Sequence, residues 1–205
     1  NTTKELLALC GKIKADSQIP FVFSSATGYW SYLRNVWYMQ YQGVDGMLDF
    51  FNGVDDGSYS RDVFLQKGRL VSLQTLDSLI NVEKKYCHNS VNTFNFTQAQ
   101  AQLLLGNGLM MVNGDWLENE MKSLEEEDEN QFTFRMMNTP VVSEIIEQCP
   151  TIPDDAALSK VIDFVDGNLD RSEIADVSDA DIARISEARH CRHSIGGQHT
   201  VGIPV

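Results

Sequence analysis

The chain has 205 residues, enough for a single domain with its own hydrophobic core. Its 29 acidic and 16 basic residues give a formal net charge of −13 and a pI near 4.6. This excess of negative charge argues against nucleic acid and anionic membrane surfaces as partners, because both are polyanions. No apolar stretch reaches the roughly 20 residues that a membrane-spanning helix requires.

The first quarter of the chain alternates helical and extended patterns. Apolar residues at helical spacing predict an amphipathic helix over Thr3–Ala15, and the short apolar run Pro20–Ser24 is typical of a strand. A loop of small residues then leads into an aromatic-rich helix predicted over Tyr29–Gln42. Gly43–Gly57 is interpreted as a short helix between glycine-bounded loops. Such alternation of strands and helices indicates an α/β fold.

The middle of the chain continues with helices. Arg61–Tyr86 is predicted to be one long helix, interrupted near Gly68, and Ala99–Leu105 forms another. Gly106–Trp116, reading GNGLMMVNGDW, then combines a strand, a tight turn and the start of a helix. Its apolar run Leu109–Val112 has the length of a buried strand. Asn and Gly follow because both tolerate the backbone angles of a sharp turn.

This strand–turn–helix predicts a binding edge. The aspartate after the turn can cap the new helix, so that the next aromatic is displayed where the strand ends. In open α/β sheets ligands bind at the carboxyl ends of the strands. The residues expected to line the edge are Asn113, Gly114, Asp115 and Trp116.

An aromatic at such an edge suits a carbohydrate. The apolar C–H face of a sugar stacks on an indole ring, while its hydroxyls need carboxylates, amides and backbone donors nearby. Tyr29 and Trp30 follow the Pro20–Ser24 strand and its loop, so one of them can project over the same edge. The alternative is that Trp116 simply packs into the core. Trp37, deep in an apolar helix, is interpreted as packing.

The last third is predicted to be mainly helical, with a strand on either side. Phe132–Met137 is interpreted as a strand, and strand character returns at 200–204. With 20–24 and 109–113 these segments are expected to form one sheet. Between them, Pro150–Arg192 is predicted to be helical and peripheral, because its apolar residues recur at helical spacing among charged ones. Those apolar residues are Leu158, Val161, Ile162 and Val165.

Several segments together carry a family resemblance. Phe96-Thr97, the following helix and GNGLMMVNGDW resemble the second-lobe signature of the extracellular solute-binding proteins of carbohydrate ABC importers, which include the maltodextrin-binding proteins. The family typically shows a helix, Gly-Lys-Ala-Ala-Met, an apolar pair, Asn-Gly and Trp; Asn107 and Leu109 stand where Lys and Ala are usual. Further segments resemble the family in the same order: NTTKELLALCGKIKAD, IPFVFSSATGYW and the final GGQHTVGIPV.

The resemblance implies a fold and a function. The fold is α/β, one lobe of a periplasmic-binding-protein-like (type II) fold, with a central sheet flanked by helices and a helical insertion over about 141–192. Since family members have two lobes and about twice this length, the chain resembles a second-lobe fragment whose first lobe is missing. The implied protein binds an oligosaccharide or another small solute outside the cell and delivers it to the permease subunits of an ABC transporter. A lipidated N-terminus outside this sequence would anchor it, and an aromatic of its Tyr29-Trp30 loop would stack on sugar.

The sequence contains none of the common motifs for catalysis or metal binding that were considered for it. The sequence lacks a Gly-x-Ser-x-Gly elbow, a phosphate-binding Gly-rich loop and a His-Glu-x-x-His motif, so neither an enzyme nor a cofactor is expected. His190 and His193 are three residues apart, but His199 lies beyond a Gly-Gly break, and zinc requires three or four well-placed ligands. Two alternatives stay open: a sugar-acting enzyme or carbohydrate-binding accessory domain, and an interaction module that uses its acidic helices.

The four cysteines do not form a disulfide scaffold by spacing. Cys10 and Cys191 continue apolar stripes and are interpreted as small buried hydrophobes. A bridge between Cys87 and Cys149 stays open.

Overall fold

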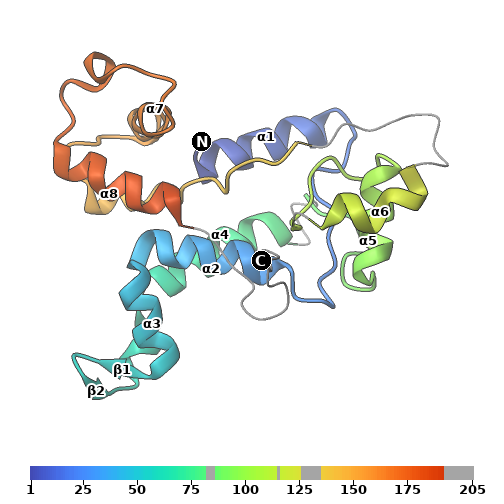
Figure 1. Ribbon diagram of the computed structural model, residues 1–205, viewed down its shortest axis with the longest axis horizontal. Coiled ribbons are helices and arrows are strands. Elements are labelled where there is room, and N and C mark those ends of the chain that lie inside the picture. The colour runs from blue at the N-terminus through green and yellow to red at the C-terminus, as the bar shows by residue number, and fades with distance from the viewer. Residues whose placement is uncertain (82–85, 115, 126–134, 192–205) are drawn as a thin grey trace, which may run out of the picture.

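Helices dominate the structure, a computed structural model that describes residues 1–81, 86–114, 116–125 and 135–191 (Figure 1). A two-stranded sheet accompanies the helices, which confirms the coarse expectation of a mixed α/β chain. The α-helices are α1 (Thr3–Ala15), α2 (Trp30–Gln42), α3 (Val44–Asn52), α4 (Lys67–Ile80), α5 (Phe96–Leu104), α6 (Leu117–Glu125), α7 (Asp155–Val165) and α8 (Asp179–His190). Shorter 3-10 helices are η1 (Asp62–Leu65), η2 (Ser143–Gln148) and η3 (Arg171–Ile174), and the strands are β1 (Val54–Asp55) and β2 (Ser58–Tyr59).

Helix starts follow local capping chemistry. The Thr2 hydroxyl accepts a hydrogen bond from the Glu5 backbone N–H (3.2 Å), and the Glu5 carboxylate accepts one from the Thr2 N–H (3.2 Å). This reciprocal arrangement satisfies two donors that a helix end leaves open, and α1 has the bounds that its apolar spacing predicts. Asn95 and Gln98 cap α5 in the same way. α5 therefore begins at Phe96, three residues before its predicted start.

The two predicted strands around the candidate site lie side by side. Phe21 forms parallel bridges with Cys87 on one side and with Met110 on the other. The Val22 N–H donates to the Met110 carbonyl (3.0 Å), and the Met110 N–H donates to the Pro20 carbonyl (2.8 Å). The two segments can approach this closely because residue 108 is a glycine. A Cβ at that position would lie 2.8 Å from the Val22 Cβ.

A regular four-stranded sheet is not formed by the described residues. Positions 135–137 carry no strand, while 132–134 and 200–204 lie outside the described residues. Among the described residues the regular sheet is the β1–β2 hairpin, whose first strand falls within the predicted Gly43–Gly57 segment and whose second strand follows it. That prediction was too long, because Gly53 adopts a left-handed conformation (φ 67°) that ends α3. The predicted 61–86 helix is likewise shorter, with η1 and α4 separated at Gln66 and α4 ending at Ile80.

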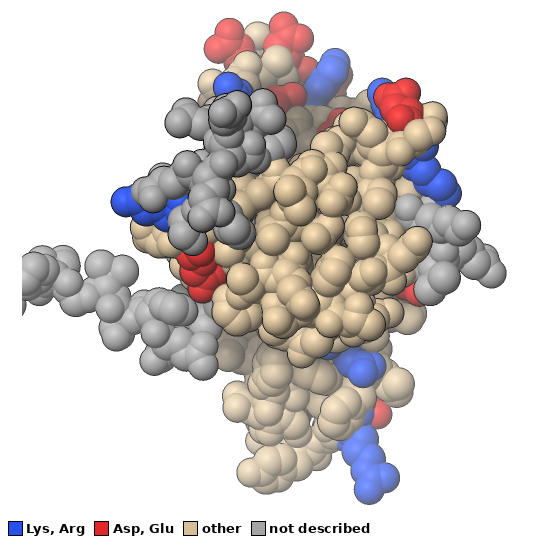
Figure 2. All heavy atoms as spheres, turned by 90° about the vertical axis from the view of Figure 1, so that its right-hand side faces the viewer, with Lys and Arg blue, Asp and Glu red and all other residues tan. Residues whose placement is uncertain are grey.

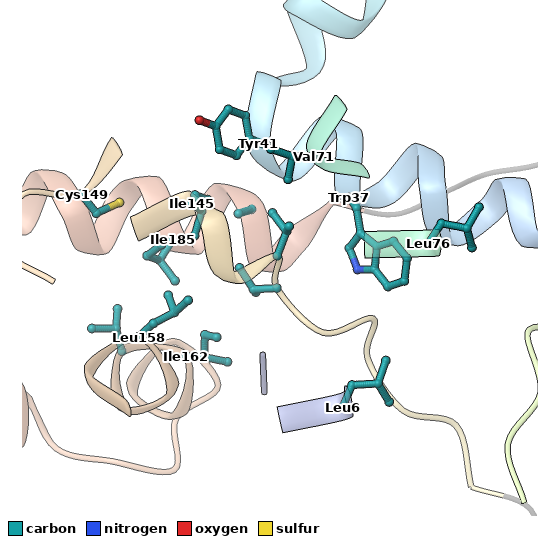
Figure 3. Packing of buried hydrophobic residues seen from close by; sticks show 14 of the residues in the cluster. Leu6, Trp37, Tyr41, Val71, Leu76, Ile145, Cys149, Leu158, Ile162 and Ile185 are labelled. Carbon is teal, nitrogen blue, oxygen red and sulfur yellow. The ribbon is translucent and has the colours of Figure 1, made fainter. Parts of the chain in front are cut away.

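The hydrophobic core joins the N-terminal helices to the C-terminal ones (Figure 3). Twelve of its 22 buried residues come from 141–188, so this region is part of the core. Helical structure over 150–190 is confirmed by α7, η3 and α8, whereas its predicted peripheral position is wrong. Helical spacing identified the apolar stripe correctly, but a stripe does not reveal what covers it.

Polar contacts secure the same junction between α2 and the later segments. The indole N–H of the fully buried Trp37 donates to the Pro140 carbonyl (3.1 Å), and this ring packs in the core as predicted. The Arg184 guanidinium donates to the backbone carbonyls of Gln40 and Tyr41, which attaches α8 to the end of α2. None of the helices that the structure describes combines the length and apolar content needed to cross a bilayer.

All four cysteines are free thiols, which answers the open question of a Cys87–Cys149 bridge in this structure. Burial raises the pKa of the Cys10 and Cys149 thiols to about 11 and, together with the neighbouring Cys10, that of Cys87 to about 12. A raised pKa lowers the thiolate fraction at a given pH, and the thiolate is the reactive form.

Thiol labelling checks this. With iodoacetamide at pH 8, folded protein is expected to react at the half-buried Cys191 first, with Cys10 and Cys149 protected. Protein denatured without reductant should take up four labels by mass spectrometry. Uptake of two would reveal a disulfide instead.

Candidate functional site

The residues of the predicted site follow two parallel segments. Residues 19–22 and 108–110 run in the same direction, so the chain leaves both at one edge. Each segment is followed by a short loop and then by a helix, α2 after the first and α6 after the second. Tyr29 directly precedes α2 and Trp116 directly precedes α6. The same local design therefore presents an aromatic side chain twice.

Tyr29 and Trp116 contact each other, although 87 positions separate them in the sequence. The Trp116 side chain hydrogen-bonds to the Tyr29 side chain, and the Tyr29 ring stacks on Tyr32 with centroids 5.3 Å apart. Burial is the main cause that raises the pKa of Tyr29, and the charges of Tyr32 and Glu120 add to it. Tyr29 therefore keeps its hydroxyl proton at neutral pH and can hydrogen-bond to a neutral ligand.

Trp116 lies on the turn that precedes it. A Cβ at Gly114 would be 2.2 Å from the indole Cζ3, so glycine is the residue that lets the ring cover the backbone at this point. The Gly114 N–H donates to the Asn113 side-chain oxygen (2.8 Å), which holds the turn. Trp116 is half-buried and is not among the residues of the hydrophobic core cluster. Asp115 lies outside the described residues.

Trp30 is placed differently from its neighbour. Its ring packs against the core cluster and faces the Arg34 guanidinium at 5.3 Å from the ring centroid. The structure therefore brings Tyr29, Gly114 and Trp116 together and directs Trp30 toward the core and Arg34.

Two polar residues that sequence analysis did not select lie beside this contact. The amide of the fully buried Gln100 in α5 donates to the Glu120 carboxylate in α6 (2.6 Å). Its carbonyl oxygen Oε1 has no hydrogen-bond partner among the described residues. Gln100 shares the buried face of α5 with Ala99 and Leu104, and this position was the available signal, because buried polar groups require partners.

The two segments that lead to the contact carry no formal charge. Residues 17–33 and 86–114 contain no Asp, Glu, Lys or Arg, although these make up 22% of the chain. Figure 2 shows the side that bears α5 and α6 as a broad uncharged surface, with the charged side chains mostly toward its edges. Exposed amides and hydroxyls give it polarity: Asn89, Asn92, Thr93, Asn95, Thr97, Gln98 and Asn107.

A cavity of about 490 Å³ lies next to the turn. It separates the 108–114 segment from the 135–140 segment, and its lining includes the predicted site residues Asn113 and Gly114. Most of its other walls are apolar, with Met110, Met111 and Met137 among them. The volume is within the range of small-ligand pockets, which places a ligand-sized space beside the predicted residues.

Metal chemistry has no site within the described residues. There, no group of three His, Cys, Asp or Glu side chains lies close enough to hold an ion. The His190 ring hydrogen-bonds to the Ser186 carbonyl (2.6 Å), while His193 and His199 lie outside the described residues.

No family model, curated protein or solved structure matches this chain.

Proposed function

We propose that this chain is the second lobe of a two-lobed extracytoplasmic solute-binding protein with a type II periplasmic-binding-protein fold, and that it presents a carbohydrate to the permease subunits of an ABC transporter. The observation that supports this proposal is the contact between Tyr29 and Trp116 at the end of two parallel segments. In such a protein the lobe supplies one wall of the site, the first lobe supplies the other, and closure excludes water. A lipidated N-terminus outside this sequence holds the protein at the cell surface.

The chemistry of the surface favours a neutral sugar. An indole and a phenol ring at one edge offer an apolar platform for sugar C–H groups. Amide side chains donate and accept at once, which matches hydroxyl groups that do the same. Residues 17–33 and 86–114 supply no counter-ion for a charged solute. The formal charges described nearby are those of Glu120, which accepts a hydrogen bond from Gln100, and of Arg135, which lines the adjacent cavity.

The same arrangement favours binding over hydrolysis. A glycosidase requires two carboxyl groups about 5–10 Å apart, on either side of the scissile bond. Of the carboxylates whose side chains the structure describes, Glu120 influences Tyr29, and it accepts a hydrogen bond from Gln100. Glu120 therefore fits the role of a fixed acceptor for a ligand hydroxyl.

The test follows the three indole N–H signals of ¹⁵N-tryptophan-labelled protein during titration with di- and oligosaccharides. Because one wall binds weakly, sugar concentrations up to about 10 mM are required. The Trp116 signal is expected to shift. Trp37 serves as the internal control, because it is fully buried and its indole N–H is hydrogen-bonded to the Pro140 carbonyl. A uronic acid should bind less well than its neutral parent. An unmoved Trp116 signal across a broad panel would contradict the proposal, and sugar cleavage in the same sample would support the enzyme alternative.

A further inference from the structure

Two arginines line a second cavity, which shares no lining residue with the cavity beside the turn. Arg34 of α2 and Arg69 of α4 both line a space of about 80 Å³. Tyr38 of α2 and the rings of Phe50 and Phe51 from α3 form apolar walls of the same cavity. Three helices thus bring together two positive side chains that are 35 positions apart in the sequence.

Each guanidinium group is held in place by its surroundings. Arg34 donates to the Asn35 side-chain oxygen (3.1 Å) and faces the Trp30 ring. Arg69 donates to the Phe64 carbonyl (3.2 Å) and lies 5.7 Å from the centroid of the Phe50 ring. Both side chains are half-buried. Such prior ordering reduces the conformational entropy that a ligand would otherwise have to overcome.

Neither arginine has an acidic partner among the described residues, and no Asp or Glu lines the cavity. Burial lowers the pKa of Arg34, and the nearby positive charge of Arg69 lowers it further. The lack of acidic partners for these two arginines is unexpected in a chain with 29 acidic and 16 basic residues, where carboxylates are abundant. Two positive charges beside apolar walls, with no negative charge between them, raise the electrostatic free energy of the folded chain. A bound anion would lower it.

We propose that this cavity binds a tetrahedral oxyanion, phosphate or sulfate, between the Arg34 and Arg69 guanidinium groups. Guanidinium groups present fixed pairs of N–H donors that match such anions, and aromatic walls strengthen the attraction by excluding water. A volume of about 80 Å³ is larger than the roughly 30 Å³ of one water and admits one small anion. The ligand is therefore a free anion or the phosphoryl end of a larger molecule.

The experiment measures thermal unfolding and calorimetric binding at pH 7 with phosphate, sulfate and glycerol phosphate, each against sodium chloride of equal ionic strength. At ten times the dissociation constant, an anion that binds only the folded chain should raise the unfolding midpoint by about 3–6 °C. Arg34→Gln and Arg69→Gln should each abolish the increase. Arg61→Gln, which removes the same charge from an exposed position outside the cavity, should keep it.

The titration with glycerol phosphate separates the two sources of the anion. Binding of inorganic phosphate but not of glycerol phosphate identifies a site for a free ion. Binding of both compounds identifies a site that also accepts the phosphoryl end of a larger molecule. Equal midpoint increases in the parent and in both glutamine variants, or an equal increase with chloride, would overturn the proposal. If a glutamine variant fails to fold, Arg69→Lys keeps the charge but loses the paired donors, and calorimetry should show weaker binding. Parent protein that binds none of the three anions would also overturn it. The result does not depend on whether the chain binds sugar.

Discussion

Replacing Ile162 with alanine is expected to lower the free energy of unfolding by about 2–5 kcal/mol. The side chain is fully buried in α7 and lies in the cluster with Leu158 and Ile185 (Figure 3). Its removal loses apolar burial and leaves a cavity, since closely packed neighbours relax only in part. Urea unfolding followed by circular dichroism measures the change, with the slope of the transition showing whether both proteins unfold from equally compact states.

The matched control is Ile80→Ala at the end of α4, where the side chain is 37% exposed and the cost should be clearly smaller. Deleting 150–191 is expected to prevent folding altogether, because eight of the 22 core residues lie in that segment. An Ile162→Ala protein within about 0.5 kcal/mol of the parent would show that α7 is peripheral after all.

Replacing Trp116 with alanine should weaken sugar binding by about 1–3 kcal/mol, roughly 5- to 150-fold in Kd, in the two-lobed protein proposed above. The substitution removes both the ring platform and its hydrogen bond to Tyr29. Titration calorimetry against the best sugar of the panel measures it. Tyr29→Phe keeps the platform and loses only the hydroxyl, so its effect should be smaller.

Trp30→Ala separates binding from stability. Because Trp30 packs against the core, its loss should appear mainly in the unfolding midpoint and only weakly in sugar affinity. The site assignment fails if Trp116→Ala binds every sugar as tightly as the parent. It fails equally if Trp30→Ala causes the larger loss of affinity in a protein that remains folded.

Local chemistry made part of this structure predictable. The Thr2–Glu5 capping box acts within four residues of the chain, so the start of α1 follows from neighbouring side chains. The same holds for the order of extended segment, loop and helix that places Tyr29 and Trp116 before α2 and α6. The hairpin was missed because its Asp56-Gly57 turn follows a helix, and the glycines around it were interpreted as loop boundaries.

By itself the sequence determined most of the helical segments, the two extended segments and the aromatic residues that follow them, because each depends on residues close together in the chain. That the two extended segments pair in parallel depends on residues far apart in the sequence, and the tertiary structure decided it. Only the tertiary structure decided which of those aromatics meet and that Gln100 contacts Glu120. It also decided that Arg34 faces the same cavity as Arg69, and that α7 belongs to the core. The physical reason is that an apolar stripe or a charged side chain has many possible partners along the chain, and close packing of distant elements selects one of them.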